Sequence, residues 1–468
     1  MGFFGAVLLV FTIFVRPQEF VPYLAGVGFM NIVTAIAVLG ILIEFGMGKT
    51  KSAWSPQLPY LAAFVGWCYL VTIIKAGRGA LSHTYSTVFI SMIFMLVVMY
   101  GARTFQRFMG MGALLLAIGC FLATMGIMQS ESEFECIVIS AADIEAGDKA
   151  TGERTGKRCV VSARECDEEA FKDGSRMLEN GDEYACERPG PFDTFSVAHG
   201  RVRWRGVLAD PNELSLAIAS SLAFGFALYN YAKSKWRNVV FAVALGLASY
   251  CIVQTQSRGG VLVLMMVFAV YFVRRYGWKG LVAGAVLGSP VLLLGGREGE
   301  EAESSTLERM GALYEGVNFV RETPIFGLGQ GQFGEHYFIT AHNSYLLAAA
   351  ELGLPGMVLW SLLVYVSMKI AYTAAWGDQP IDPRIRPFAM ALFVAFCGIM
   401  VGIMFLSFCY HALLFVYFGL AGALYGAVKQ TCPGFKVKLT GYDYGAVIGA
   451  DALIISFLFV YTRIKGAP

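Results

Sequence analysis

Three arginines stand close together in the stretch Arg201-Val-Arg-Trp-Arg-Gly-Val-Leu-Ala-Asp-Pro-Asn-Glu. The Asp-Pro-Asn near its end suits the start of a helix, because Asp and Asn cap helix N-termini and Pro is tolerated in the first turn. That role does not explain three arginines within five residues. We therefore expect Arg203 or Arg205 to bind an anion. The alternative is contact with lipid headgroups or with the acidic segment that precedes the stretch.

A second stretch, Gln254-Thr-Gln-Ser-Arg-Gly-Gly, holds Arg258, the one charged residue between Arg237 and Arg274. It forms a short turn between two apolar segments, and its glycines permit close approach of other backbone. An ionisable side chain at the edge of an apolar layer is a functional-site candidate by default. The alternative is an arginine that extends its head group to the interface. We expect Arg258 to have a functional role.

A third stretch places glycines and a histidine close in sequence. Thr323-Pro-Ile-Phe-Gly-Leu-Gly-Gln-Gly-Gln-Phe precedes Ala341-His-Asn-Ser-Tyr-Leu and then Glu351-Leu-Gly-Leu-Pro-Gly. The glycines Gly327, Gly329 and Gly331 are expected to form a turn with exposed amides, although three glycines alone do not define a nucleotide site. His342 precedes a helix cap. It is either structural or a proton acceptor, and His336 is the second candidate.

Apolar segments must position these residues. Of the 468 residues, 56% are hydrophobic and 15% are charged, and the net charge is +2. This composition excludes a soluble enzyme, a disordered chain and a nucleic-acid binder. A membrane helix needs about 20 apolar residues. Thirteen windows approach this, which predicts an all-α integral membrane protein with 12 or 13 spans, near residues 2–15, 30–45, 57–74, 84–100, 110–128, 212–232, 238–254, 259–273, 280–295, 343–368, 388–406, 412–428 and 446–462.

Lysine and arginine are unevenly divided between alternate short connections. One set holds 15 of them and the other holds 4: Arg16, Lys75, Arg78 and Arg258. Because cytoplasmic loops are enriched in Lys and Arg, the first set should face the cytoplasm. The three stretches described above, with the 296–342 segment, then face the opposite side of the membrane.

An acidic segment interrupts the membrane body. Between Gln129 and Arg201 the sequence has 17 acidic and 9 basic residues, and it includes four of the ten cysteines. Outside the cytoplasm such cysteines are normally oxidised. We expect two disulfides among Cys136, Cys159, Cys166 and Cys186, with three connectivities open. Unpaired thiols or a zinc site are the alternatives, and zinc is disfavoured because no Cys-x-x-Cys pair occurs.

Together the three stretches resemble the bacterial O-antigen ligase and O-antigen polymerase family of membrane glycosyltransferases. The resemblance covers roughly residues 200–428, and the Gly-Leu-Gly-Gln-Gly-Gln-Phe and Ala-His-Asn-Ser-Tyr-Leu stretches are its most specific part. Such proteins take a glycan from an undecaprenyl-diphosphate carrier at the periplasmic face of the inner membrane. They pass it to lipid A–core sugar, to another carrier-linked glycan or to a protein hydroxyl. The long cysteine-bearing insert departs from the family pattern and leaves the acceptor open.

The resemblance implies that Arg258 and His342 match the family's essential arginine and histidine, and that Arg203 or Arg205 matches a further arginine. The chemistry agrees with these residue types. Arginines can stabilise a departing diphosphate through paired hydrogen bonds without a metal ion, and a neutral histidine can take the proton of an acceptor hydroxyl. Direct displacement would invert the anomeric centre. No cofactor is expected, and metal binding at the Asp143/Glu145 pair is disfavoured.

Three other functions remain open. A polymerase of the same family shares these motifs. A lipid-linked glycan flippase should show internal repeats and charges at mid-membrane, but no repeat is found and Asp451 is the main intramembrane acid. A glycan-binding subunit without turnover would not need His342. The sequence divides into 1–128 and 343–468 as terminal membrane helices, 129–205 as the insert, 206–295 as central helices and 296–342 as a periplasmic catalytic loop.

Overall fold

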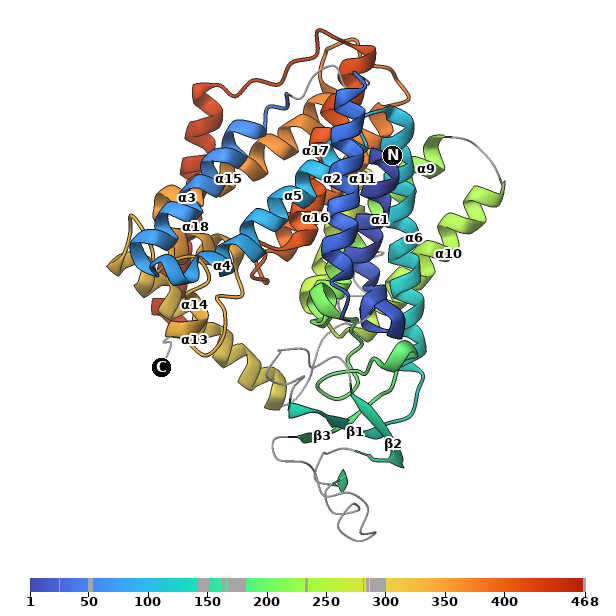
Figure 1. The fold of residues 1–468 in the computed structure, drawn as a ribbon, viewed down its shortest axis with the longest axis vertical. Coiled ribbons are helices and arrows are strands. Elements are labelled where there is room, and N and C mark those ends of the chain that lie inside the picture. The colour runs from blue at the N-terminus through green and yellow to red at the C-terminus, as the bar shows by residue number, and fades with distance from the viewer. Residues whose placement is uncertain are drawn as a thin grey trace. The chain divides into compact units, whose positions relative to one another are not determined.

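A computed structural model describes residues 1–24, 26–48, 54–141, 152–160, 165–166, 182–231, 235–280, 282, 286 and 300–465. Within these residues ten helical segments are long and apolar enough to cross a membrane, and two shorter apolar helices, α1 and α16, accompany them. The ninth predicted window, near 280–295, lies largely outside the described residues. The predicted class, a polytopic helical membrane protein, is confirmed (Figure 1).

The chain forms two compact units, and both are discontinuous in sequence. Unit 1 comprises residues 1–10, 33–112 and 297–468, and unit 2 comprises residues 11–32 and 113–296. The helices are α1 (Gly2–Val15), α2 (Phe29–Gly46), α3 (Leu58–Lys75), α4 (Leu81–Thr84), α5 (Ile90–Gly101), α6 (Phe105–Ser130), α9 (Pro211–Tyr231), α10 (Lys235–Gln254), α11 (Arg258–Tyr276), α13 (Glu300–Glu322), α14 (Phe333–His336), α15 (Ser344–Trp376), α16 (Arg386–Gly402), α17 (Ala412–Thr431) and α18 (Gly441–Lys465).

In unit 1 the most buried span is α17, which packs against α5, α15 and α16. Gly419, Gly422 and Gly426 follow one another at helical spacing along it. A side chain at Gly419 would collide with the Met95 carbonyl oxygen of α5, and one at Gly422 would collide with Met99. Small residues at such spacing let membrane helices approach closely, because packing rather than water exclusion holds them together.

The long helix α15 changes direction at Gly353, which has a φ of 71°. The following Pro355 cannot donate a backbone hydrogen bond. The bend allows the Leu354 amide to donate to the Pro324 carbonyl at 2.8 Å. Further along, Lys369 of α15 forms an ion pair of 2.6 Å with Asp443 of α18. Helix α15 therefore links the segment that precedes His342 to the C-terminal helix.

The predicted loop 296–342 contains regular structure. Helix α13 occupies residues Glu300–Glu322 and packs against α15 and α18, and the short α14 occupies Phe333–His336. The glycine-rich stretch lies between these two helices. Its conformation is therefore supported at both ends rather than only by its own turns.

In unit 2 the helices α9, α10 and α11 pack together, with α9 in contact with both of the others. Helix α9 is buried over most of its length, whereas only 22% of the α10 window and 28% of the α11 window are buried. Helix α9 contains three serines among mainly apolar residues such as Ala, Leu and Phe. Ser215, Ser220 and Ser221 each donate to a carbonyl three residues earlier, so these polar groups need no partner from lipid.

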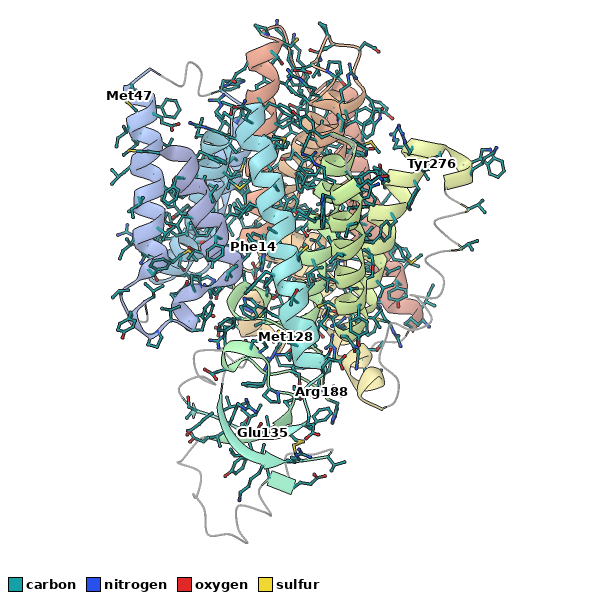
Figure 2. All side chains as sticks on the ribbon, turned by 90° about the vertical axis from the view of Figure 1, so that its right-hand side faces the viewer. Phe14, Met47, Met128, Glu135, Arg188 and Tyr276 are labelled. Carbon is teal, nitrogen blue, oxygen red and sulfur yellow. A yellow bond between two sulfur atoms is a disulfide. The ribbon has the colours of Figure 1, made fainter. Side chains whose placement is uncertain are left out.

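The insert follows α6 and contains the one sheet among the described residues. Strands β1 (Glu135–Ile139), β2 (Glu153–Arg158) and β3 (Glu183–Glu187) form an antiparallel sheet in the order β2-β1-β3. Figure 2 shows Glu135 and Arg188 beyond Met128 near the end of α6. The all-α expectation holds for the membrane helices, and the insert adds this small sheet.

Two disulfides close the insert, as predicted. Cys136 pairs with Cys166, and Cys159 pairs with Cys186. All four cysteines are buried and form a common cluster with Phe134 and Tyr184. A segment of this size cannot build a large core, so covalent links replace part of the missing burial.

Candidate active site

The first two predicted stretches lie side by side in unit 2. The Arg201 side chain donates through Nε to the Thr255 carbonyl at 3.0 Å, and the Val202 amide donates to the Gln254 carbonyl at 3.4 Å. Arg201 and Thr255 are 54 residues apart in the sequence, so the packing of α9 and α10 brings them together. The Arg-rich stretch and the turn that carries Arg258 therefore form one local structure.

A buried hydrogen-bond network joins the starts of α9 and α11. The Ser257 hydroxyl donates to Asn212 Oδ1 at 2.6 Å and accepts from the Gly260 amide at 2.9 Å. Asn212 in turn donates from its amide and its side chain to Asp210 Oδ1. A side chain at Gly260 would collide with Ser215. The glycine thus permits the close approach that the sequence pattern predicted.

Arg258 is the first residue of α11 and is exposed. Ser257 caps this helix, and the preceding Gln256 has a φ of 49°, in the left-handed region. A helix N-terminus presents free amides and the positive end of the helix dipole, which favour an anion. Arg258 adds a guanidinium at the same place, so the start of α11 is suited to a phosphate-like group.

Arg203 and Arg205 are buried, with 6% and 2% of their surface exposed. Arg203 donates through Nε to the Phe195 carbonyl at 2.9 Å, and its guanidinium lies over the Phe195 ring. Arg205 donates to the Glu19 carbonyl at 2.7 Å. The contacts of Arg203 and Arg205 within the protein also stabilise the Arg-rich stretch. Arg258 differs because it is exposed at the surface.

Arg16 lies near Arg205, although the sequence analysis used it only in the count of Lys and Arg. Arg16 has a φ of 59° and forms an ion pair of 2.7 Å with Glu19. Its guanidinium packs directly over Gly206, where a side chain would collide with it. Arg16 thus lies beside the Arg205 group. In the sequence, Arg16 stood out only because it lies in the set of loops that is poor in Lys and Arg. Its contact with Gly206 could not be predicted, because the two residues are far apart in the chain.

In unit 1 the glycine-rich turn is bound to α15, and its amides are not exposed. The Gly331 and Phe333 amides donate to the two carboxylate oxygens of Glu351 at 2.9 and 3.1 Å. The Gly329 amide donates to the Glu351 carbonyl, and the Gly327 amide to the Thr323 carbonyl. The expectation of exposed amides was wrong, because the protein's own carboxylate already occupies the place an external anion would take.

The other side of the same turn contacts the region before α5. Gln330 is buried, accepts from the Thr84 hydroxyl at 2.9 Å and donates to Thr87 at 3.1 Å. Residues Tyr85–Phe89 form a π-helix, a local widening that frequently occurs at functional sites. His83 borders Gly331, where a side chain would collide with its ring. Neither Glu351 nor His83 was identified as a site residue from the sequence.

His342 has a φ of 47° and immediately precedes Asn343, which caps α15 by accepting from the Leu346 amide at 3.0 Å. Its side chain is half-buried. The backup candidate, His336, is exposed, with Nδ1 2.9 Å from the Gln332 carbonyl and its ring against Phe319. His342 belongs to unit 1 and the three predicted arginines belong to unit 2.

Three cysteines of the insert lie close enough together to hold a metal ion, but they are oxidised. Sulfur atoms of Cys136, Cys159 and Cys166 lie within 4.8 Å of one another. All three are disulfide-bonded, and a disulfide sulfur is a poor ligand because metals bind the thiolate. Asp143 and Glu145 lie outside the described residues.

Comparison with known proteins gives a match to one family model. The family model described as O-antigen ligase matches residues 243–361, a segment that contains Arg258, His342 and Glu351. The search of curated proteins gives no match. A solved structure titled "Structural coordination of polymerization and crosslinking by a peptidoglycan synthase complex" is similar over 81% of this chain and 98% of its own, at 13% identity and a TM-score of 0.42. The chain is therefore similar to the O-antigen ligase family over residues 243–361.

Proposed function

We propose that the protein transfers a glycan from an undecaprenyl-diphosphate-linked donor to an acceptor hydroxyl at the periplasmic face of the bacterial inner membrane. The observation that supports this most is the exposed Arg258 at the start of α11, fixed by the buried Ser257–Asn212 hydrogen bond within the family-matched segment. Nucleotide sugars are absent outside the cytoplasm. A transferase there needs a donor that the membrane carries.

In this proposal Arg258 binds the donor diphosphate. The bond between the anomeric carbon and the phosphate oxygen breaks, and the departing diphosphate gains negative charge. A planar guanidinium can offer two parallel hydrogen bonds to that charge, and the N-terminus of α11 adds its dipole. Arg203 and Arg205 contribute from buried positions, where their charge is less screened than at the surface. Charge stabilisation of this kind does not require a metal ion.

His342 is the proposed general base. Its neutral imidazole takes the proton of the acceptor hydroxyl as the new bond to the anomeric carbon forms. Undecaprenyl diphosphate leaves, and attack from the opposite face inverts the anomeric configuration. Imidazole is suited to this role because one ring nitrogen of its neutral form accepts a proton.

The test is glycan transfer from a diphosphate-linked lipid donor in liposomes, with His342→Ala and wild type at matched protein amounts. The variant should lose at least about 10²-fold in turnover, while donor binding changes little. Transfer should also continue in EDTA. Wild-type turnover in His342→Ala would remove the general-base role. Inhibition by EDTA that a divalent ion reverses would contradict the arginine-based mechanism.

The acceptor distinguishes a ligase from a polymerase. Offered both lipid A–core and a second carrier-linked glycan, a ligase extends the first and a polymerase lengthens the second. A flippase would move the donor across the bilayer of the same liposomes without forming a new glycosidic bond. Analysis of the products by mass spectrometry separates these three outcomes.

A further inference from the structure

The backbone of His342 adopts a conformation that a non-glycine residue seldom takes without support. Its φ of 47° lies in the left-handed region, between the buried Ala341 and the cap residue Asn343. Such a conformation is energetically unfavourable and persists only where surrounding contacts enforce it. Something in unit 1 must therefore hold this residue.

The hydroxyl of Ser407 supplies the contact. Ser407 Oγ accepts a hydrogen bond from the His342 amide at 3.0 Å and donates one to Thr340 Oγ1 at 2.9 Å. A single side-chain oxygen thus binds the residues on both sides of Ala341. Ser407 lies 65 residues after His342 and outside the family-matched segment, which ends at residue 361.

Ser407 is itself fixed relative to the start of α15. The Ser344 amide donates to the Ile403 carbonyl at 2.9 Å, and the Ser344 hydroxyl donates to the Leu406 carbonyl at 2.6 Å. The Phe408 amide donates back to the Ser344 hydroxyl at 2.7 Å. Residues 403–408, between α16 and α17, are therefore held against the start of α15, and the Ser407 backbone cannot move away from His342 without breaking these bonds.

We propose that Ser407 is a positioning residue for the general base: by binding the His342 amide it fixes the backbone from which the imidazole projects. This rests on the proposed function, because it assigns a role in the step that His342 performs. A base displaced by about 1 Å can lose about 10²-fold in rate, so loss of this anchor should be visible in turnover.

The experiment measures turnover and the donor KM for Ser407→Ala, Ser407→Thr and His342→Ala, and for the Ser407→Ala/His342→Ala double variant. Ser407→Ala should lower kcat about 10-fold or more and change the donor KM less than about twofold. Ser407→Thr keeps the hydroxyl and should recover most of the loss. In the His342→Ala background the Ser407 change should cause no further loss, because a positioning effect needs the residue that it positions.

Ser91→Ala is the matched control. Its hydroxyl donates to the Tyr410 carbonyl at 3.0 Å, so it contacts the same connection between α16 and α17 but not His342. This variant should keep wild-type kcat. If Ser407→Ala is not recovered from membranes, Ser407→Cys replaces it, because a thiol is a weak acceptor, and its kcat should also fall.

Wild-type kcat in Ser407→Ala, or losses that multiply in the double variant, would overturn the positioning role. A fully active His342→Ala would instead overturn the general-base role that the proposed function gives to His342. The two failures are therefore distinguishable.

Discussion

At the scale of single residues, Arg258 differs from the other predicted arginines because its side chain is exposed. Arg258→Ala should weaken donor binding and slow turnover together, by about 10-fold or more, since a hydrogen bond to a charged group contributes about 1.5–3 kcal/mol. Arg258→Lys should recover only part, because an ammonium lacks the planar fork. Donor titration and transfer rates measure both effects.

The control for this prediction is Arg384→Ala. Arg384 is also well exposed and forms an ion pair of 2.8 Å with Asp382 in the connection before α16. Its loss removes one positive charge without touching the start of α11. Equal losses in the two variants would mean that net charge, rather than the position of Arg258, governs donor binding.

Residue types predicted some of the candidate site and not the rest. Arg258 and His342 could be identified because each is an ionisable residue in an otherwise apolar or glycine-rich context. Arg16, Glu351 and Ser407 could not, because their importance lies in contacts with Gly206, Gly331 and His342, far away in sequence. Which residues meet depends on how the helices pack, and a local pattern does not contain that information.

At the scale of elements, the bend of α15 depends on Gly353. Its φ of 71° disfavours any other residue, and an added side chain would collide with the Ile325 carbonyl. Gly353→Ala should lower the thermal unfolding midpoint in detergent, with a cost of about 1–3 kcal/mol. Gly334→Ala is the control, because a side chain there meets nothing within 4 Å. Equal midpoints in the two variants would contradict the role of the bend.

The insert should contain two specific disulfides. Mass analysis of non-reduced peptides is expected to show Cys136 joined to Cys166 and Cys159 joined to Cys186. Removing either pair should destabilise the insert by roughly 2–4 kcal/mol. Free thiols or a different pairing in freshly purified protein would contradict the arrangement of β1 and β3.

The sheet of the insert should also respond to acid. Burial raises the pKa of Glu135. Hydrogen bonds from Arg154 and from the Gly156 amide lower this pKa by more than burial raises it, so the net shift is downward. A carboxyl with a lowered folded pKa stabilises the protein above its unfolded pKa and loses that contribution as pH falls through the folded value. The thermal unfolding midpoint should therefore decrease as the pH falls below about 4.5. The decrease should be smaller in Glu135→Gln. Equal pH dependence would contradict the assignment.

At the scale of the whole molecule, the sides of the membrane remain a prediction from the 15-to-4 distribution of Lys and Arg. Glu153 and Arg384 are both exposed. A cysteine in Glu153→Cys should react with an impermeant thiol reagent added outside intact cells. A cysteine in Arg384→Cys should react only after the membrane is opened. The native cysteines outside the two disulfides are buried or half-buried, so background labelling should be low. Reversed labelling would place the proposed active site in the cytoplasm.

The helical membrane class could be predicted because composition and window length are local properties. The division into two units could not, since each unit joins segments from distant parts of the chain. Helix α13 was also missed: its sequence is too polar to resemble a span, and contacts with α15 and α18 support it.

The pairing of α5 with α17 has a consequence for how the protein is made. Roughly 300 residues separate the two helices. At a translation rate of about 5–20 residues per second, α17 is synthesised about 15–60 s after α5. During that time the surface later covered by the glycines of α17 faces lipid or another protein. Unit 2 needs nothing after residue 296. A nascent chain that stalls there would leave a complete unit 2 beside an unfinished unit 1, a membrane intermediate open to quality-control proteases.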